Sequence, residues 1–126
     1  MSIFKKLFGK STTEQETQTG NRKEPEHAVI VYFDYKKENL EPLQELERKL
    51  EKVITEKKTG EYDGHEISVD YNDGILYMYG PNAEVLFKTV KQTLEATDFM
   101  SGAKAKLRFG PPEDGVKEIE VKVGID

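Results

Sequence analysis

Residues 65–82 have the sequence HEISVDYNDGILYMYGPN, and this stretch decides the fold of the chain. Apolar and polar residues alternate on both sides of Tyr71-Asn72-Asp73-Gly74, a sequence typical of a turn between two strands. Gly80-Pro81-Asn82 follows with residues that begin helices, Asn82 or Gly80 as the N-cap and Pro81 at the first helical position. The stretch therefore predicts a β-hairpin followed directly by a helix.

One strand and one helix precede this hairpin. Residues 28–33 are a short, nearly continuous apolar run, typical of a central strand that is covered on both faces. From Asn39 or Glu41 onward, aliphatic residues recur every three or four positions. This spacing predicts an amphipathic helix that ends at Gly60, the natural left-handed stop. We interpret the opposite face of this helix, rich in Glu, Arg and Lys, as solvated.

A helix and a second hairpin follow. Residues 83–94 carry an apolar stripe at helical spacing, and the pattern fades before Gly102. Two alternating segments, 104–109 and 118–123, flank a loop over 110–115 that is rich in Gly and Pro. The polar face of the first segment is Lys and Arg, and that of the second is mainly Glu. Paired across a hairpin, these two rows predict cross-strand ion pairs, and we prefer this interpretation to a basic binding site.

The predicted fold class is α+β. The order of elements matches a ferredoxin-like β-α-β-β-α-β arrangement with an extra C-terminal strand. Right-handed connections then place both helices on one face of an antiparallel sheet, with the first and third strands at its centre. We expect a single domain over residues 27–126, because a chain of 126 residues has room for one modest core.

Residues 1–26 form a separate segment. Residues 1–10 contain a short amphipathic stretch in which the apolar side chains of residues 3–8 share one helical face. We expect either an anchor, with residues 3–10 touching a membrane surface or a partner groove, or a frayed tail. Residues 11–26 contain no large apolar side chain, and this composition predicts a flexible linker.

Composition excludes several classes of protein. The net charge of −5 opposes binding to phosphate backbones, so we expect no nucleic-acid partner. No apolar run approaches the roughly 20 residues of a transmembrane helix. The chain contains no cysteine, which excludes disulfides and thiolate chemistry and fits a cytoplasmic location.

Two surfaces are candidates for binding. The predicted topology gathers polar residues of three turns at one end of the sheet, beside the N-terminus of the second helix, which attracts anions. These residues are His27, Asp63, His65, Asn82, Glu113 and Asp114. The alternative is that they only build turns and helix caps. The second surface is the open face of the sheet, where we expect Tyr77 and Tyr79 with Phe33 or Tyr32 beside them.

Known catalytic and ligand-binding signatures are missing. The two histidines have no diagnostic ligand spacing with the nearby carboxylates, so we expect no metal. Residues 70–74 lack the ligand pattern of a calcium loop. The chain has no nucleophile elbow, phosphate-binding loop or dinucleotide fingerprint, and we expect no cofactor and assign no catalytic residue.

Three motifs resemble a family of small uncharacterised bacterial proteins. They are EYDG at 61–64, LYMYGPNA at 76–83 and RFGPPEDGV at 108–116. The resemblance covers under half of the chain. It implies a bacterial cytoplasmic protein, and it brings no catalytic residues with it because the family has no established activity.

Two functions follow from these observations. The first is a small non-enzymatic binding or regulatory module with a protein partner. The alternative is a small enzyme or ligand-binding protein with its site at the sheet end formed by residues 61–66, 80–82 and 110–115. Small size, acidic charge and the lack of a catalytic signature favour the first.

Overall fold

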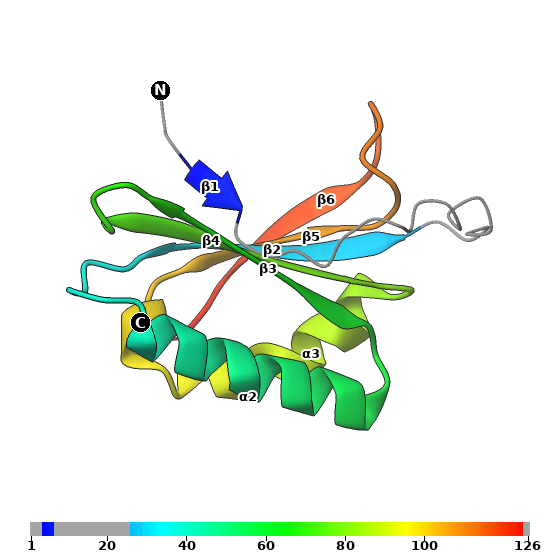
Figure 1. The fold of residues 1–126 in the computed structure, drawn as a ribbon. Helices are drawn as coiled ribbons and strands as arrows, with labels where there is room; N and C mark the ends of the chain where they lie inside the picture. Colours follow the sequence, from blue (N-terminus) through cyan, green and yellow to red (C-terminus); the bar gives the residue numbers. More distant parts are fainter. Residues whose placement is uncertain (1–3, 7–25, 125–126) are drawn as a thin grey trace.

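Two helices cover one face of an antiparallel sheet (Figure 1). The computed structural model describes residues 4–6 and 26–124. In chain order, its elements are β1 (Phe4–Lys6), β2 (His27–Asp34), α2 (Glu41–Lys57), β3 (Glu61–Ser68), β4 (Asp73–Gly80), α3 (Ala83–Glu95), the 3-10 helix η1 (Asp98–Met100), β5 (Lys104–Arg108) and β6 (Glu118–Lys122). From β2 to β6 this is the predicted ferredoxin-like arrangement with an extra C-terminal strand.

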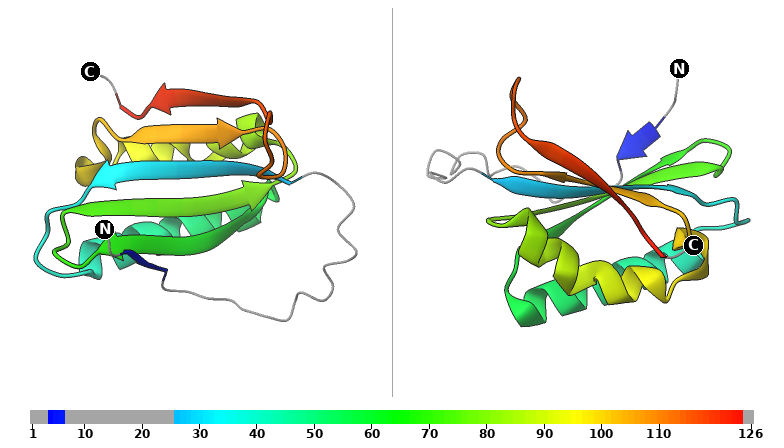
Figure 2. Two further views of the ribbon diagram at one scale, coloured as in Figure 1. Left: turned by 90° about the horizontal axis from the view of Figure 1, so that it is seen from above. Right: turned by 180° about the vertical axis from the view of Figure 1, so that it is seen from behind.

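The sheet has the strand order β1-β3-β4-β2-β5-β6, and every neighbouring pair is antiparallel (Figure 2). β2 and β4 lie at its centre, as the sequence predicts. Ile30 of β2 is opposite Tyr77 of β4 and Lys106 of β5. Because side chains opposite each other share a face, this register determines which residues face the helices.

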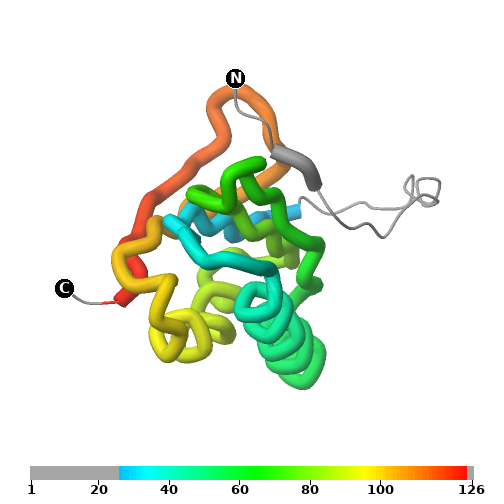
Figure 3. Tube along the Cα trace, turned by 60° about the vertical axis from the view of Figure 1, so that its left-hand side comes forward, coloured from blue at the N-terminus to red at the C-terminus, as the bar shows by residue number. Residues whose placement is uncertain are grey.

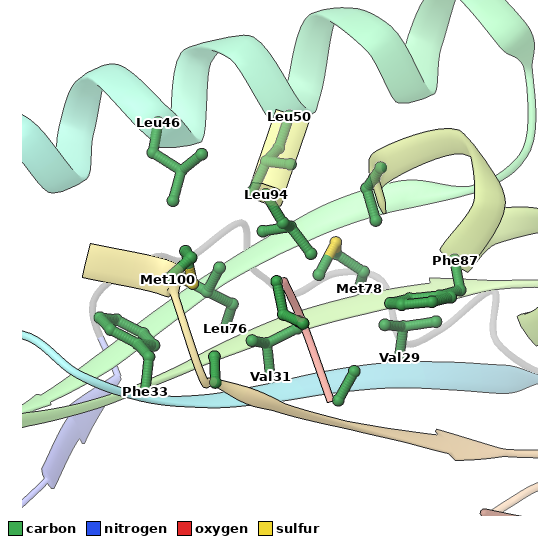
Figure 4. Packing of buried hydrophobic residues seen from close by; sticks show 14 of the residues in the cluster. Val29, Val31, Phe33, Leu46, Leu50, Leu76, Met78, Phe87, Leu94 and Met100 are labelled. Atoms are coloured by element: carbon green, nitrogen blue, oxygen red, sulfur yellow. The ribbon is translucent and has the colours of Figure 1, made fainter. Parts of the chain in front are cut away.

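The core lies between the helices and the sheet (Figure 4). Alternate residues of the central strands point into it, because successive side chains of a strand leave on opposite faces. The helices contribute the stripes that the sequence predicts. The helix residues in this core are Leu43, Leu46, Leu50 and Ile54 of α2 and Ala83, Leu86, Phe87, Val90 and Leu94 of α3.

The left-handed residue that ends α2 is Lys58, with φ of 57°, and the prediction that Gly60 would end it was wrong. Gly60 instead permits a close backbone contact. A Cβ on Gly60 would lie 2.2 Å from the carbonyl oxygen of Tyr79, and one on Gly80 would lie 2.4 Å from that of Thr59. The two glycines therefore allow the entry to β3 and the end of β4 to touch backbone to backbone.

The turn of the first hairpin lies slightly earlier than predicted, because β4 already begins at Asp73. Asp70 organises it: its carboxylate accepts hydrogen bonds from Ser68 Oγ at 2.8 Å and from the N–H of Asn72 at 3.0 Å. Tyr71 takes a positive φ of 63°. A side chain that satisfies the turn's own amides can hold such a residue in place.

Phe4–Lys6 form a strand and not part of the helix that we expected within residues 1–10. β1 pairs with Glu66–Ser68 at the edge of β3. An edge strand offers unpaired N–H and C=O groups, whereas so short a helix is marginal in water. The rest of the predicted flexible segment lies outside the described residues, apart from Glu26.

Candidate functional site

The N-terminus of α3 is closed by side chains of the predicted site. His27 Nδ1 accepts the N–H of Ala83 at 3.0 Å. Asn82 Oδ1 accepts the N–H groups of Glu84 and Val85 at 3.0 and 3.1 Å. Asn82, one of the two predicted candidates, is thus the N-cap. Pro81 precedes the helix, so its predicted place at the first helical position was wrong. Because these amides already have acceptors, this helix end does not offer the free anion-binding amides that we expected.

His65 lies in the core, beneath α2, and not at the surface of the sheet end. Its side chain is opposite Leu76 on the helix-facing side of the sheet and is only 5% exposed. Nδ1 is 2.7 Å from Oε2 of Glu47 on α2. The hydroxyl of Tyr62 donates to the same oxygen at 2.5 Å. Since a carboxylate only accepts, Nδ1 of His65 carries the proton and donates it.

Glu47 is the residue that the sequence analysis missed. It stands four residues after Leu43 and three before Leu50, inside the apolar stripe of α2 and not on its solvated face. Its side chain is 18% exposed. A lone carboxylate within an apolar stripe indicates a polar partner in the facing strand, because buried charges require compensation. That signal was present in the sequence.

The cluster of Glu47, Tyr62 and His65 is built to hold α2 against β3. Partial removal of the Tyr62 hydroxyl from water, followed by the negative charge of Glu47, raises the pKa of Tyr62 well above its ordinary value. Nε2 of His65 is enclosed and has no hydrogen-bond partner. Nδ1 of the same ring is bonded to Glu47, so the imidazole is fixed between α2 and β3. The arrangement therefore fits a structural anchor.

Asp63 and Gly64 form an irregularity at the same end of β3. The register shifts between Tyr62 and Gly64, which is a β-bulge, and Gly64 has a φ of 123°. Glycine adopts this conformation without steric penalty. The bulge turns the strand so that both Tyr62 and His65 face α2, although an undisturbed strand would send them to opposite faces.

Glu113 and Asp114 belong to the loop that follows β5. Both are exposed in the loop between β5 and β6, which stands away from the helices (Figures 1 and 3). The base of the loop is held by Arg108, a largely buried residue whose Nε donates to the carbonyl of Gly110 at 2.7 Å. The loop is thus anchored at the sheet end, while its two carboxylates point to solvent.

The open face of the sheet has a striped composition. Its residues form three rows that run from β3 through β4, β2 and β5 to β6. The rows are Glu61, Tyr79, Ala28, Arg108 and Glu118; then Gly64, Tyr77, Ile30, Lys106 and Glu120; then Glu66, Ile75, Tyr32, Lys104 and Lys122. An apolar and aromatic centre on β4 and β2 therefore lies between acidic groups on β3 and a basic strip on β5.

The tyrosines of this stripe are placed as predicted, and Tyr32, not Phe33, is the aromatic residue beside them. Phe33 is 5% exposed and faces the core, whereas Tyr32 is 40% exposed. The hydroxyl of Tyr77 donates to Glu66 Oε1 at 2.8 Å. Lys106 Nζ lies 5.7 Å from the centre of the Tyr32 ring, within range of a cation–π contact.

The predicted ion pairs between β5 and β6 are diagonal. Lys104 is 3.9 Å from Glu120, and Lys106 is 3.9 Å from Glu118. The residue directly opposite Lys104 is another cation, Lys122. Exposed pairs at this distance contribute little to stability. Both lysines are therefore able to exchange their partners.

A surface depression of about 490 Å³ lies at the other end of the sheet, away from the predicted site. Its lining includes Asp34, Asp73 and Ser101–Lys104. Hence this depression does not coincide with His27, Asn82 or the loop over 110–115.

The comparisons with known proteins give no identification: no protein-family model, curated protein or solved structure matches the chain. Within residues 4–6 and 26–124, no three His, Asp or Glu side chains are grouped to hold a metal ion. In the same part of the chain, neither helix has the length and apolar character needed to cross a membrane.

Proposed function

We propose that this protein is a small non-enzymatic binding module that recognises a protein partner through the open face of its sheet. One observation carries the proposal: α2 and α3 cover only one face of the sheet (Figure 2), and the side chains of the other face form the apolar centre on β4 and β2. Apolar and aromatic groups on a surface framed by charges are typical of protein interfaces.

The alternative site at the sheet end has less support. His27 and Asn82 have the N–H groups of α3 as partners, and His65 has Glu47. Hydrogen bonds within the fold therefore explain the presence of these three predicted site residues. Tyr77 and Tyr79, in contrast, belong to the apolar and aromatic centre of the open face.

The apolar centre and the basic strip of the open face indicate the kind of partner. We propose a protein segment whose apolar side chains lie on the centre formed by Tyr32, Tyr77 and Tyr79, with carboxylates directed toward β5. Lys104 and Lys106 are 3.9 Å from their present carboxylates and are partly exposed. A partner carboxylate can replace such a weak pair at little cost.

The proposal includes the cellular setting. The absence of cysteine suits a reducing compartment, and the three motifs resemble bacterial proteins. We therefore place the binding module in the bacterial cytoplasm.

A photoreactive benzoylphenylalanine in place of Tyr32 tests the proposal. Irradiation of the full chain in a bacterial lysate is expected to give a discrete adduct, whereas the same probe in place of the exposed Lys88 on α3 gives none. Lys106→Glu should weaken the Tyr32 adduct, because it repels the proposed carboxylates. Equal adducts from both probe positions, or an adduct that Lys106→Glu does not change, would contradict the proposal.

A further inference from the structure

The two edges of the sheet differ. The β3 edge is partly occupied by β1, which pairs with Glu66–Ser68. The β6 edge is open: in the described part of the chain, no strand lies beyond β6 (Figure 2, left). α3 packs on β2, β4 and β5, and α2 packs on β3. An open edge is a template for another strand.

The backbone groups that face outward from β6 follow from the hydrogen bonds on its inner side. The carbonyl of Lys117 accepts from Phe109 N–H at 2.9 Å, and the N–H of Val123 donates to the Ala103 carbonyl at 2.8 Å. Because alternate residues of an antiparallel strand direct their N–H and C=O groups to the same side, the odd-numbered residues bond to β5. Glu118, Glu120 and Lys122 therefore direct their N–H and C=O groups away from the sheet.

We propose that β6 pairs with β6 of a second copy of this chain, so that the two sheets join across a two-fold axis. In this antiparallel pair, outward-facing residues must lie opposite outward-facing residues. An axis at Ile119 places Glu118 opposite Glu120 of the partner subunit, twice. An axis at Glu120 pairs Glu118 with Lys122 of the partner subunit twice, but it also places Glu120 opposite Glu120 of the partner subunit. An axis at Val121 places Glu120 opposite Lys122 of the partner subunit, twice.

The axis at Val121 also gives Lys122 and Ile119 of this edge partners in the second copy. Lys122 lies opposite Lys104 within its own chain, and no described carboxylate lies within ion-pair distance of it. The pairing supplies one. Ile119, which is 43% exposed, comes beside Val123 of the partner subunit. Opposite charges across neighbouring strands stabilise the pair, and like charges destabilise it.

The inference goes beyond the proposed binding function, because it concerns the sheet edge and not the open face. Charged residues on an edge strand normally prevent association. Here the opposite signs two residues apart make the strand self-complementary. The contact is small, so the dimer is expected to be weak and reversible.

Analytical ultracentrifugation of the full chain over a concentration series that reaches the millimolar range is the first test. The wild type should shift from monomer to dimer. Glu120→Lys and Lys122→Glu should each weaken association about tenfold or more, because two like-charge pairs replace two ion pairs. The double variant with both changes should dimerise again. Glu45→Lys and Lys88→Glu, at exposed helix positions, are the matched charge controls and should dimerise like the wild type.

The register is tested by oxidation, since the chain has no cysteine of its own. Val121→Cys should form a disulfide-linked dimer, because this residue faces its own copy across the axis, and opposite Cα atoms there are about 4.5 Å apart. Ile119→Cys and Glu120→Cys should cross-link much more slowly. A monomeric wild type, a double variant as weak as the single ones, or faster cross-linking at 119 or 120 would overturn the proposal.

Discussion

Glu47 joins α2 to β3 through two side chains of the strand. One of its carboxylate oxygens accepts hydrogen bonds from both Tyr62 and His65. Removal of this acceptor leaves two partly or fully buried donors without a partner. Unsatisfied donors of this kind are more damaging than the loss of the bond itself, because their desolvation is no longer compensated.

We expect Glu47→Ala to lower the free energy of unfolding by about 1–3 kcal/mol, the usual penalty for a buried polar group that loses its partner. Glu47→Gln, which keeps one acceptor oxygen, should lose less. Glu45→Ala, at an exposed position of the same helix, should stay within about 0.5 kcal/mol of the wild type. Urea denaturation measures all three, and equal stability of Glu47→Ala and Glu45→Ala would show that the cluster is not an anchor.

Tyr62 gives the protein a pH dependence on the alkaline side. The folded state raises the pKa of Tyr62, whereas an unfolded chain ionises tyrosine near pH 10. The stabilisation is therefore fully present below about pH 10 and decreases as the pH rises further, because only the unfolded chain loses the proton.

Urea denaturation between pH 9 and 11 tests this linkage. Wild-type stability should fall with a slope that approaches about 1.4 kcal/mol per pH unit from this group. Tyr62→Phe should lack that part of the slope. An identical pH dependence of the two proteins would mean that Tyr62 ionises as readily in the folded state as in the unfolded chain.

At the level of the elements, periodicity predicted the core correctly. Leu50 and Leu86 were expected on the apolar stripes, and both are fully buried. Leu50→Ala and Leu86→Ala should each lower the free energy of unfolding by about 2–5 kcal/mol, since a cavity remains. Val85→Ala, at a 45% exposed position of α3, is the control and should have little effect. Thermal or urea denaturation distinguishes them; a loss below about 0.5 kcal/mol at either leucine would exclude it from the core.

The boundaries and edges of elements were harder to predict than their existence. Lys58 ends α2, and Gly60, two residues later, touches the backbone of Tyr79, which is distant in the sequence. Likewise, the extended conformation of Phe4–Lys6 depends on an open edge at β3. The helix and strand propensities of a short segment do not show that Tyr79 lies beside Gly60 or that β3 lies beside Phe4–Lys6.

At the scale of the whole molecule, the sequence predicted the topology of the sheet. It predicted the positions of the site residues only in part. The sequence indicated which strand ends meet, and it named Asn82 as one of two candidates for the cap of α3. It did not reveal that the bulge at Asp63 and Gly64 turns His65 toward α2. A prediction from alternation assumes that the strand has no bulge. One extra residue moves every later side chain of the strand to the opposite face of the sheet.

We propose that the open face is the side of the sheet that binds a partner. Its apolar centre and the basic strip on β5 come from three segments of the chain, β2, β4 and β5. The sheet end, in contrast, contains residues with partners inside the fold. We therefore propose that binding depends on the open face and not on the sheet end.

The most direct test is to measure the affinity of variants for the partner that is isolated by cross-linking at Tyr32. Tyr32→Ser and Lys106→Glu should each weaken binding about tenfold or more, as for aromatic and charged residues at the centre of an interface. Glu113→Ala and Asp114→Ala should bind like the wild type. The opposite result, normal binding by the open-face variants and loss of binding when the loop carboxylates are removed, would contradict the account.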